Sequence, residues 1–165
     1  MHVSLIISTY NSPNALYLVL KSIEAQTKIP SEVIIADDGS DDLTRNCIVD
    51  FQRTASFKIV HSWQNDKGFR VAQSRNKAIA KSTSDYIVLI DGDVILHNKF
   101  IEDHINHAEC GYFIQGSRVL LGLSETKKTL DNCNIGFSFF SRGLSNRKNA
   151  IYSMFFSKLF LNKNN

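Results

Sequence analysis

Two carboxylates stand one residue apart in Asp91-Gly92-Asp93, directly after the apolar run from Tyr86 to Ile90. A short run rich in β-branched residues and bounded by a charged turn predicts a strand buried on both faces. Carboxylates this close repel each other unless a positive charge lies between them. Mg²⁺ and Mn²⁺ prefer oxygen ligands and typically bind one or two carboxylates together with substrate phosphates. The segment therefore predicts a divalent cation site, with a solvated Asp-Gly turn as the alternative interpretation.

A second acidic pair, Asp37 and Asp38, ends the apolar segment that begins at Glu32. Carboxylates at this place can cap the helix that follows, but Asp41 and Asp42 can do the same. The sequence thus holds more acids than one cap requires, which favours a ligand role for the first pair.

Arg70 and Arg75 lie five residues apart, where a polar loop passes into a predicted helix. A helix N-terminus and a guanidinium together suit a diphosphate, because arginine pairs with phosphate oxygens through two hydrogen bonds. The alternative interpretation is a surface arginine that is solvated on its helix.

These residues need elements that bring them together, and the hydrophobic pattern predicts such elements. Strands of mostly apolar residues alternate with helices of 10 to 15 residues, which is typical of βαβ units and a parallel sheet. Right-handed crossovers then place the loops at 9–11, 37–40 and 91–93 at one edge. The predicted strands cover residues 3–8, 32–36, 57–61 and 86–90, and the predicted helices cover residues 13–26, 43–51 and 71–81.

The pattern after Asp93 is less regular. Apolar residues from Phe100 to Ala108 predict a short helix, and Gly111 to Leu121 predict a strand. No periodic pattern predicts an element from Gly122 onward. We therefore divide the chain into a core at residues 1–121 and a second segment at residues 122–165.

Taken together, residues 3–11, 31–40 and 91–93 resemble the family 2 glycosyltransferases of GT-A fold. A fourth piece, Lys67-Gly68-Phe69-Arg70 with Ala72, Arg75 and Asn76, resembles the bacterial branch that builds lipopolysaccharide and capsule sugars. The resemblance covers roughly residues 3 to 120. It implies an α/β, Rossmann-like fold with a mostly parallel sheet flanked by helices. It also implies a metal-dependent, inverting transfer of a sugar from a UDP-sugar to a hydroxyl of a surface glycan.

The resemblance also implies the site residues. Asp37, in preference to Asp38, and Thr9 would contact the uridine, and Arg70 or Arg75 would face the phosphates. Asp93, Asp91 and His97 would hold Mn²⁺ or Mg²⁺; a neutral histidine without a metal role is the alternative for His97. The full donor nucleotide set is Thr9, Tyr10, Asn11, Asp37, Asp38, Gly68, Arg70, Arg75, Asn76, Asp91 and Gly92.

A general base is the missing part of this set. Inverting transfer needs a group, usually a carboxylate, that accepts the proton of the acceptor hydroxyl. No Asp or Glu follows Asp131, and neither Glu125 nor Asp131 belongs to a recognisable motif. We therefore expect the donor-binding portion of a longer transferase, with residues 122–165 as an incomplete acceptor-side segment. The alternative is a catalytically inactive module that binds nucleotide sugars.

Charge distribution predicts where the protein acts. The net charge is +3, yet the last 34 residues hold five basic side chains and no acid. With the apolar stretch Ile151 to Leu161, this allows a peripheral contact of residues 142–165 with an anionic membrane surface. A helix that packs on a missing segment is the favoured alternative, because the aromatic residues leave no wide polar face. The start of the chain lacks signal-peptide features, and no apolar run reaches about 18 residues, which predicts a cytoplasmic location.

Two other functional classes fit the sequence poorly. A phosphoacceptor signalling domain also gathers aspartates at strand ends, but it expects its acidic pair after the first strand. Here the pair follows the second strand. Nucleic-acid binding is disfavoured because acids outnumber basic residues before residue 132 and no aromatic stripe interleaves them.

Overall fold

The computed structural model describes residues 1–150, so the apolar stretch Ile151 to Leu161 lies outside the described residues. The chain divides into two compact units, Met1–Ile114 and Gln115–Asn165. The boundary predicted at residue 121 falls inside the second unit, because Leu120 and Leu121 pair with a strand of that unit.

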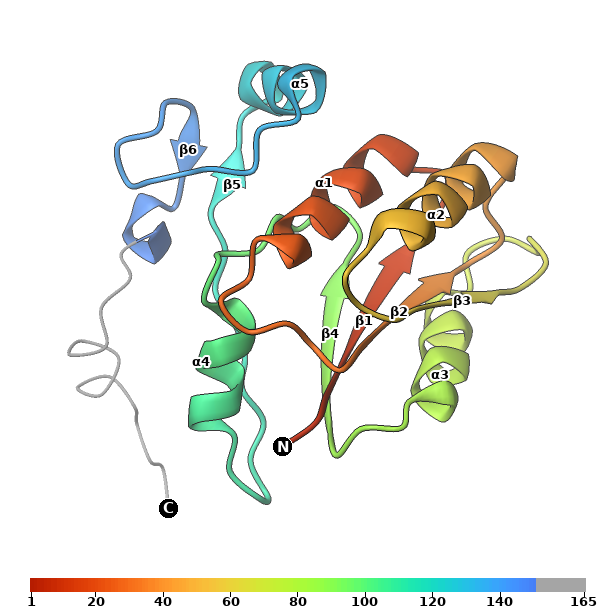
Figure 1. Ribbon diagram of the computed structural model, residues 1–165. Helices are drawn as coiled ribbons and strands as arrows, with labels where there is room; N and C mark the ends of the chain where they lie inside the picture. Colours follow the sequence, from red (N-terminus) through yellow and green to blue (C-terminus); the bar gives the residue numbers. More distant parts are fainter. Residues whose placement is uncertain (151–165) are drawn as a thin grey trace. The chain divides into compact units, whose positions relative to one another are not determined.

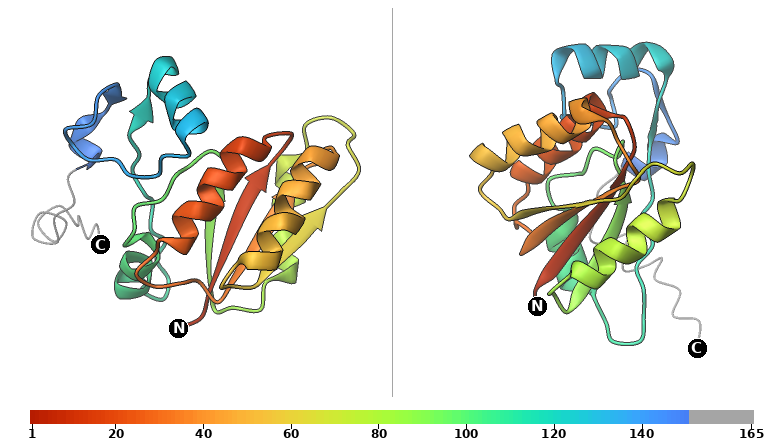
Figure 2. Two further views of the ribbon diagram at one scale, coloured as in Figure 1. Left: turned by 45° about the horizontal axis from the view of Figure 1, so that its top comes forward. Right: turned by 90° about the vertical axis from the view of Figure 1, so that its right-hand side faces the viewer.

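The first unit is a four-stranded parallel sheet with the strand order β3-β2-β1-β4 (Figure 1). Figure 2 shows α1 and α2 on one face of this sheet and α3 on the other. The predicted α/β fold is therefore confirmed. The elements are β1 (Val3–Thr9), α1 (Pro13–Glu24), β2 (Glu32–Asp37), α2 (Asp42–Thr54), β3 (Ile59–Trp63), α3 (Val71–Lys81), β4 (Tyr86–Asp91) and α4 (Phe100–His107).

The two central strands are buried along their whole length, as expected for a parallel sheet covered on both faces. Their side chains alternate between two cores, because successive residues of a strand point to opposite faces. Leu5 and Ile35 belong to the larger core, on the face of α1 and α2, whereas Ile6 and Ile34 belong to a smaller core with Ala78 of α3.

Local sequence signals set the helix ends. Pro13 occupies the first turn of α1, where its missing N–H costs no helical hydrogen bond. Asp41 caps α2 and accepts a hydrogen bond from the Thr44 backbone N–H at 3.2 Å. Asn11 has a φ of 45°, and its Oδ1 accepts a hydrogen bond from the Asp41 backbone N–H at 2.8 Å. The loops after β1 and β2 are therefore tied to each other.

The strand predicted from Gly111 to Leu121 is wrong. Only Leu120–Leu121 is a strand, β5, which pairs antiparallel with β6 (Leu144–Ser145). Tyr112 and Phe113 are exposed, and residues 111–119 find no strand partner within the described part of the chain. An apolar run without a neighbouring strand has no backbone partner and does not become part of a sheet.

The second unit also contains α5 (Leu123–Asn132) and a short 3₁₀ helix, η1 (Arg147–Ala150). The sequence pattern missed α5 because Thr129 is its one buried side chain, so it lacks the apolar stripe of a core helix. Within residues 1–150, no helix combines the length and the hydrophobicity needed to cross a bilayer.

A buried carboxylate, Glu32, joins the strand starts at the amino edge of the sheet. Its Oε1 accepts hydrogen bonds from Ser4 Oγ at 2.7 Å and from the Thr83 backbone N–H at 2.8 Å, and Lys58 Nζ donates to Oε2 at 2.9 Å. Burial raises the pKa of Glu32, but the hydrogen bonds from Thr83, Lys58 and Ser4 outweigh it and lower the pKa to about 2. The charged form of Glu32 therefore stabilises the fold.

We predict that Glu32→Gln lowers the free energy of unfolding by about 2–3 kcal/mol at pH 7, because it leaves buried donors poorly paired. The native pKa of Glu32 lies below its ordinary value of 4.5. Its contribution is therefore complete above about pH 4.5 and is lost as the pH falls towards 2. Urea unfolding of wild type and variant should show a gap that narrows below about pH 4.5. A gap that stays constant down to pH 2 would contradict the role, and Glu109→Gln, at an exposed position, is the matched control.

Candidate functional site

The polar loops predicted to converge do lie at one edge of the sheet. In the strand register, Thr9 of β1 is the partner of Asp37 of β2, and Ser8 is the partner of Asp91 of β4. The carboxyl ends of β1, β2 and β4 are thus direct neighbours. Open α/β sheets bind their ligands at this edge.

Asp37 has no exposed surface and holds its own loop together. Its Oδ1 accepts hydrogen bonds from the backbone N–H groups of Gly39 at 3.1 Å and Ser40 at 2.8 Å, and its Oδ2 lies 2.8 Å from His61 Nε2. Burial raises the pKa of Asp37, but the hydrogen bonds from His61 and Ser40 outweigh it, so the pKa lies below its ordinary value. The geometry gives Asp37 a positioning role, and a contact between it and uracil stays a prediction.

Asp38 connects the end of β2 to the segment between β3 and α3. Gln64 Nε2 donates to its Oδ1 at 2.6 Å, and the Arg70 backbone N–H donates to its Oδ2 at 2.7 Å. This second bond fixes the residue just before α3, so the start of the helix is held next to the end of β2. Asp38 thereby brings Arg70 to the edge where the strand ends gather.

The segment between β3 and α3 is held at a second point by Asp66. Its Oδ2 accepts a hydrogen bond from Tyr10 Oη at 2.9 Å, and its Oδ1 accepts one from the Gly68 backbone N–H at 2.9 Å. The hydrogen bond to Asp66 raises the pKa of Tyr10. Gly39, with a φ of 101°, lies against the same residue, and a Cβ there would come within 2.6 Å of Asp66 Cα. Only glycine fits this contact.

Arg75 and Asp91 form an ion pair between α3 and β4. Arg75 Nη2 lies 2.5 Å from Asp91 Oδ1, and Arg75 Nε donates to Ser8 Oγ at 2.7 Å. The Arg75 side chain is 34% exposed, so it is partly accessible from solvent. Arg70 instead turns to its own segment, where it hydrogen-bonds to Gln73 Oε1 at 2.9 Å and to the carbonyl oxygen of Asn65. Arg75 is therefore the better-placed arginine for phosphates.

Asp93 is exposed and forms no hydrogen bond or ion pair within residues 1–149. Gly92 beside it is buried, and a Cβ at this position would approach the Ser8 carbonyl oxygen to 2.6 Å. No group of three or more His, Cys, Asp or Glu side chains suited to a metal occurs in the described part of the chain, so His97 is not grouped with the two aspartates. Two carboxylates still fit a cation whose remaining ligands are phosphate oxygens and water.

Five buried polar side-chain atoms of the described residues lack a hydrogen-bond partner. All of them belong to β1, to β3 and the segment after it, or to the first turns of α3. Buried polar atoms are normally paired, so a concentration of unpaired ones marks a place where water or a ligand supplies the partner. The atoms are Thr9 Oγ1, Ser62 Oγ, Gln64 Oε1, Arg70 Nε and Ser74 Oγ.

The sequence predicted Thr9 and Arg70 but not Ser62, Gln64 or Ser74, which stand in no motif. Asn76 lies on the exposed side of α3 and forms no hydrogen bond among residues 1–149. The predicted roles of Asn76 and Gly68 remain predictions, because no contact of the chain distinguishes them.

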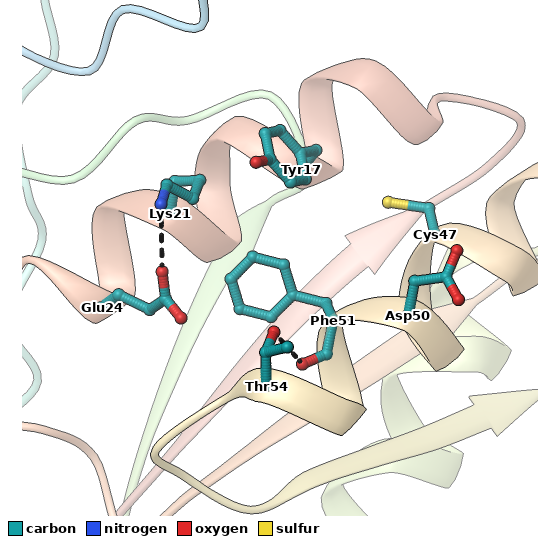
Figure 3. A pocket seen from close by; sticks show the side chains of 7 residues that line it. All are labelled: Tyr17, Lys21, Glu24, Cys47, Asp50, Phe51 and Thr54. Atoms are coloured by element: carbon teal, nitrogen blue, oxygen red, sulfur yellow. Dashed lines mark hydrogen bonds and ion pairs between the residues drawn. The ribbon is translucent and has the colours of Figure 1, made fainter.

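A groove of about 480 Å³ lies elsewhere, between α1 and α2 (Figure 3). Lys21 and Glu24 form an ion pair along its rim, and burial raises the pKa of the Cys47 thiol at its other side. The raised pKa disfavours the thiolate form of Cys47. Its lining consists of Tyr17, Lys21, Glu24, Cys47, Asp50, Phe51 and Thr54.

The family model for glycosyl transferase family 2 matches residues 4–163. The chain belongs to this family. Two curated relatives are a validoxylamine A glucosyltransferase of Streptomyces hygroscopicus subsp. limoneus, 31% identical over 101 residues, and the O-antigen chain rhamnosyltransferase RfbN of Salmonella typhimurium, 32% identical over 120 residues.

The matches cover 60% and 67% of this chain but only 22% and 37% of the two relatives, so the chain spans a minor part of their length. Among solved structures, the crystal structure of S. aureus TarS 1–349 in complex with UDP-GlcNAc is 25% identical with a TM-score of 0.54. That match covers 64% of this chain and 30% of TarS 1–349. The structural likeness confirms the fold expected from the family resemblance.

We predict unequal effects on stability for two aspartates of this site. Asp37→Asn should lower the free energy of unfolding by about 2 kcal/mol, because a buried amide cannot accept all three hydrogen bonds that the carboxylate accepts. Asp93→Asn should change it by less than about 0.5 kcal/mol, because the side chain is exposed and makes no contact. Urea unfolding measures both values. A larger loss for Asp93→Asn than for Asp37→Asn would contradict the assignment.

Proposed function

We propose that this chain binds the nucleotide of a UDP-sugar at the carboxyl edge of its sheet, as the donor-binding part of an inverting glycosyltransferase. The observation that carries the proposal is the gathering of unpaired polar groups at this one edge. Buried atoms such as Thr9 Oγ1 and Gln64 Oε1 lack partners there, and Asp93 lacks a counter-charge in the described residues. Membership of glycosyl transferase family 2 supports the reaction class.

The geometry supports different roles for the aspartates and for Arg75 within the site. Asp37 orders the loop after β2, and Asp38 ties the end of β2 to the residue before α3. Either aspartate can therefore position the groups around the base, and only one of them needs to contact it. Arg75 lies at the junction of α3 and β4, and its partly exposed side chain suits a phosphate oxygen. The donor would then lie across the ends of β1, β2 and β4, with its uridine towards β2 and its diphosphate towards β4.

A divalent cation, Mn²⁺ or Mg²⁺, fits the β4 end of this arrangement. Asp93 would hold it, and Asp91 would contribute an oxygen while its other side remains paired with Arg75. When bound, such a cation stabilises the negative charge that builds on a departing nucleoside diphosphate. His97 belongs to the proposal only as a further ligand recruited on binding.

The acceptor is proposed to be a hydroxyl of a bacterial surface glycan, either lipopolysaccharide or capsule. The segment from Lys67 to Arg70, with Arg75 and Asn76, supports this through its resemblance to that branch of the family. The likeness to an O-antigen chain rhamnosyltransferase also supports it. A lipid-linked acceptor would place the protein on the cytoplasmic face of the membrane, with residues 142–165 as the contact.

A second candidate is a module that binds nucleotide sugars without transferring them. The observation that favours it is that residues 132–165 hold no Asp or Glu, the usual general bases of inverting transfer. Transfer assays with a panel of glycan acceptors distinguish the two functions. Donor binding without transfer to any acceptor would favour the module.

We predict that calorimetric titration with UDP in the presence of Mn²⁺ gives saturable binding, and that EDTA abolishes it. Asp93→Ala should weaken binding at least about tenfold, because it removes a proposed ligand of the cation that bridges to the phosphates. Asp85→Ala is the matched control, since this exposed aspartate precedes β4 at the opposite edge of the sheet. Equal binding by wild type and Asp93→Ala would contradict the proposed donor site.

A further inference from the structure

The second unit carries two phenylalanines at the tip of a tight turn. The Ser141 backbone N–H donates to the Ser138 carbonyl at 3.0 Å, and the Ser138 backbone N–H donates to Ser141 Oγ at 2.9 Å. Phe139 and Phe140 are the two central residues of this turn. Their rings pack edge to face, with centroids 5.5 Å apart and an interplanar angle of 89°.

This aromatic tip is open to solvent. Phe140 is 85% exposed and Phe139 is 40% exposed. A single exposed aromatic residue is common on protein surfaces, but two adjacent rings at the point of a closed turn form a compact apolar projection. The rings already pack on each other, so inserting them into an apolar layer requires no rearrangement of the turn.

Three basic residues lie close to the aromatic tip in the sequence, and one of them contacts it. Arg147 donates from Nη1 to the Phe139 carbonyl at 3.2 Å and from Nε to the Leu144 carbonyl at 3.3 Å, so its guanidinium is fixed beside the turn. Arg142 follows the turn directly, and Lys148 follows Arg147. All three basic side chains are exposed, and none forms a salt bridge with a described residue.

The two units also differ in charge. Residues 1–114 hold 14 acids and 11 Lys or Arg, whereas residues 115–165 hold two acids and eight Lys or Arg. One of the two acids, Glu125, is paired with Lys128 at 2.7 Å. The second unit thus has an excess of positive charge with few internal partners, and its aromatic tip lies within the most basic stretch.

We propose that Phe139 and Phe140 insert into the interface of an anionic lipid bilayer while Arg142, Arg147 and Lys148 bind lipid phosphates. Aromatic rings favour the headgroup region, and basic residues next to them are attracted to anionic lipids. This surface deepens the proposed function by naming the residues of the membrane contact. It differs from the apolar stretch after residue 150, since it is complete within the described residues.

The test is sedimentation of the full chain with sucrose-loaded vesicles, in the absence of donor and acceptor. We expect binding to vesicles of phosphatidylcholine mixed with phosphatidylglycerol, little binding to phosphatidylcholine alone, and weakening by added salt. The double variant Phe139→Ser and Phe140→Ser should weaken binding by about tenfold or more. Phe113→Ser is the matched control, because this phenylalanine is 88% exposed but lies outside the aromatic tip.

Three results would overturn the proposal. The first is a lack of binding to anionic vesicles, and the second is binding that the double variant leaves unchanged. The third is self-association of the wild type that the double variant abolishes without any vesicle binding, which would make the aromatic tip a contact between copies. Urea unfolding of the variants checks that the turn tolerates both substitutions. Nucleotide binding is measured separately, so failure here leaves the proposed donor site standing.

Discussion

Like charges at one edge of a parallel sheet are the constraint on which this structure depends. Parallel strands place all their carboxyl ends on the same side, and this chain ends β2 and β4 with aspartates. Each of these carboxylates must find donors or a cation nearby. Asp37 accepts hydrogen bonds from backbone N–H groups and pairs with His61. Asp38 accepts hydrogen bonds from Gln64 and from the Arg70 backbone N–H, and Asp91 forms an ion pair with Arg75.

That pattern of compensation has a consequence for function. The donors that satisfy the first three aspartates come from the chain itself, so those residues are held rigidly and shape the loops around them. Asp93 has no such donor within the described residues and lies in the open. Asp93 thus lies next to the Arg75–Asp91 ion pair and near several unpaired buried polar atoms. This part of the edge is where a ligand or a cation can supply the missing partners.

The alternation of strands and helices could be predicted from the sequence because it depends on local periodicity. β1 and β4 are dense in β-branched residues, and Pro13 and Asp41 mark helix starts through chemistry that acts within a few residues. The convergence of the polar loops followed from the handedness of the crossovers. These features needed no knowledge of distant contacts.

Other features could not be predicted because they arise from contacts between residues far apart in the chain. His61 reaches Asp37 across 24 residues, and Gln64 reaches Asp38 across 26 residues; neither lies in a motif. The same limit explains the strand wrongly expected from Gly111 to Leu121. Its apolar residues suit a sheet, but the structure provides no strand beside most of them.

The most direct test of the central claim is a crystal structure of the chain with UDP and Mn²⁺, with the ion located by its anomalous scattering. The account predicts one Mn²⁺ at the carboxyl edge, bound by the Asp93 carboxylate and by the diphosphate, with Arg75 still next to Asp91. An ion or nucleotide bound away from Asp93, for example in the groove between α1 and α2, would contradict it.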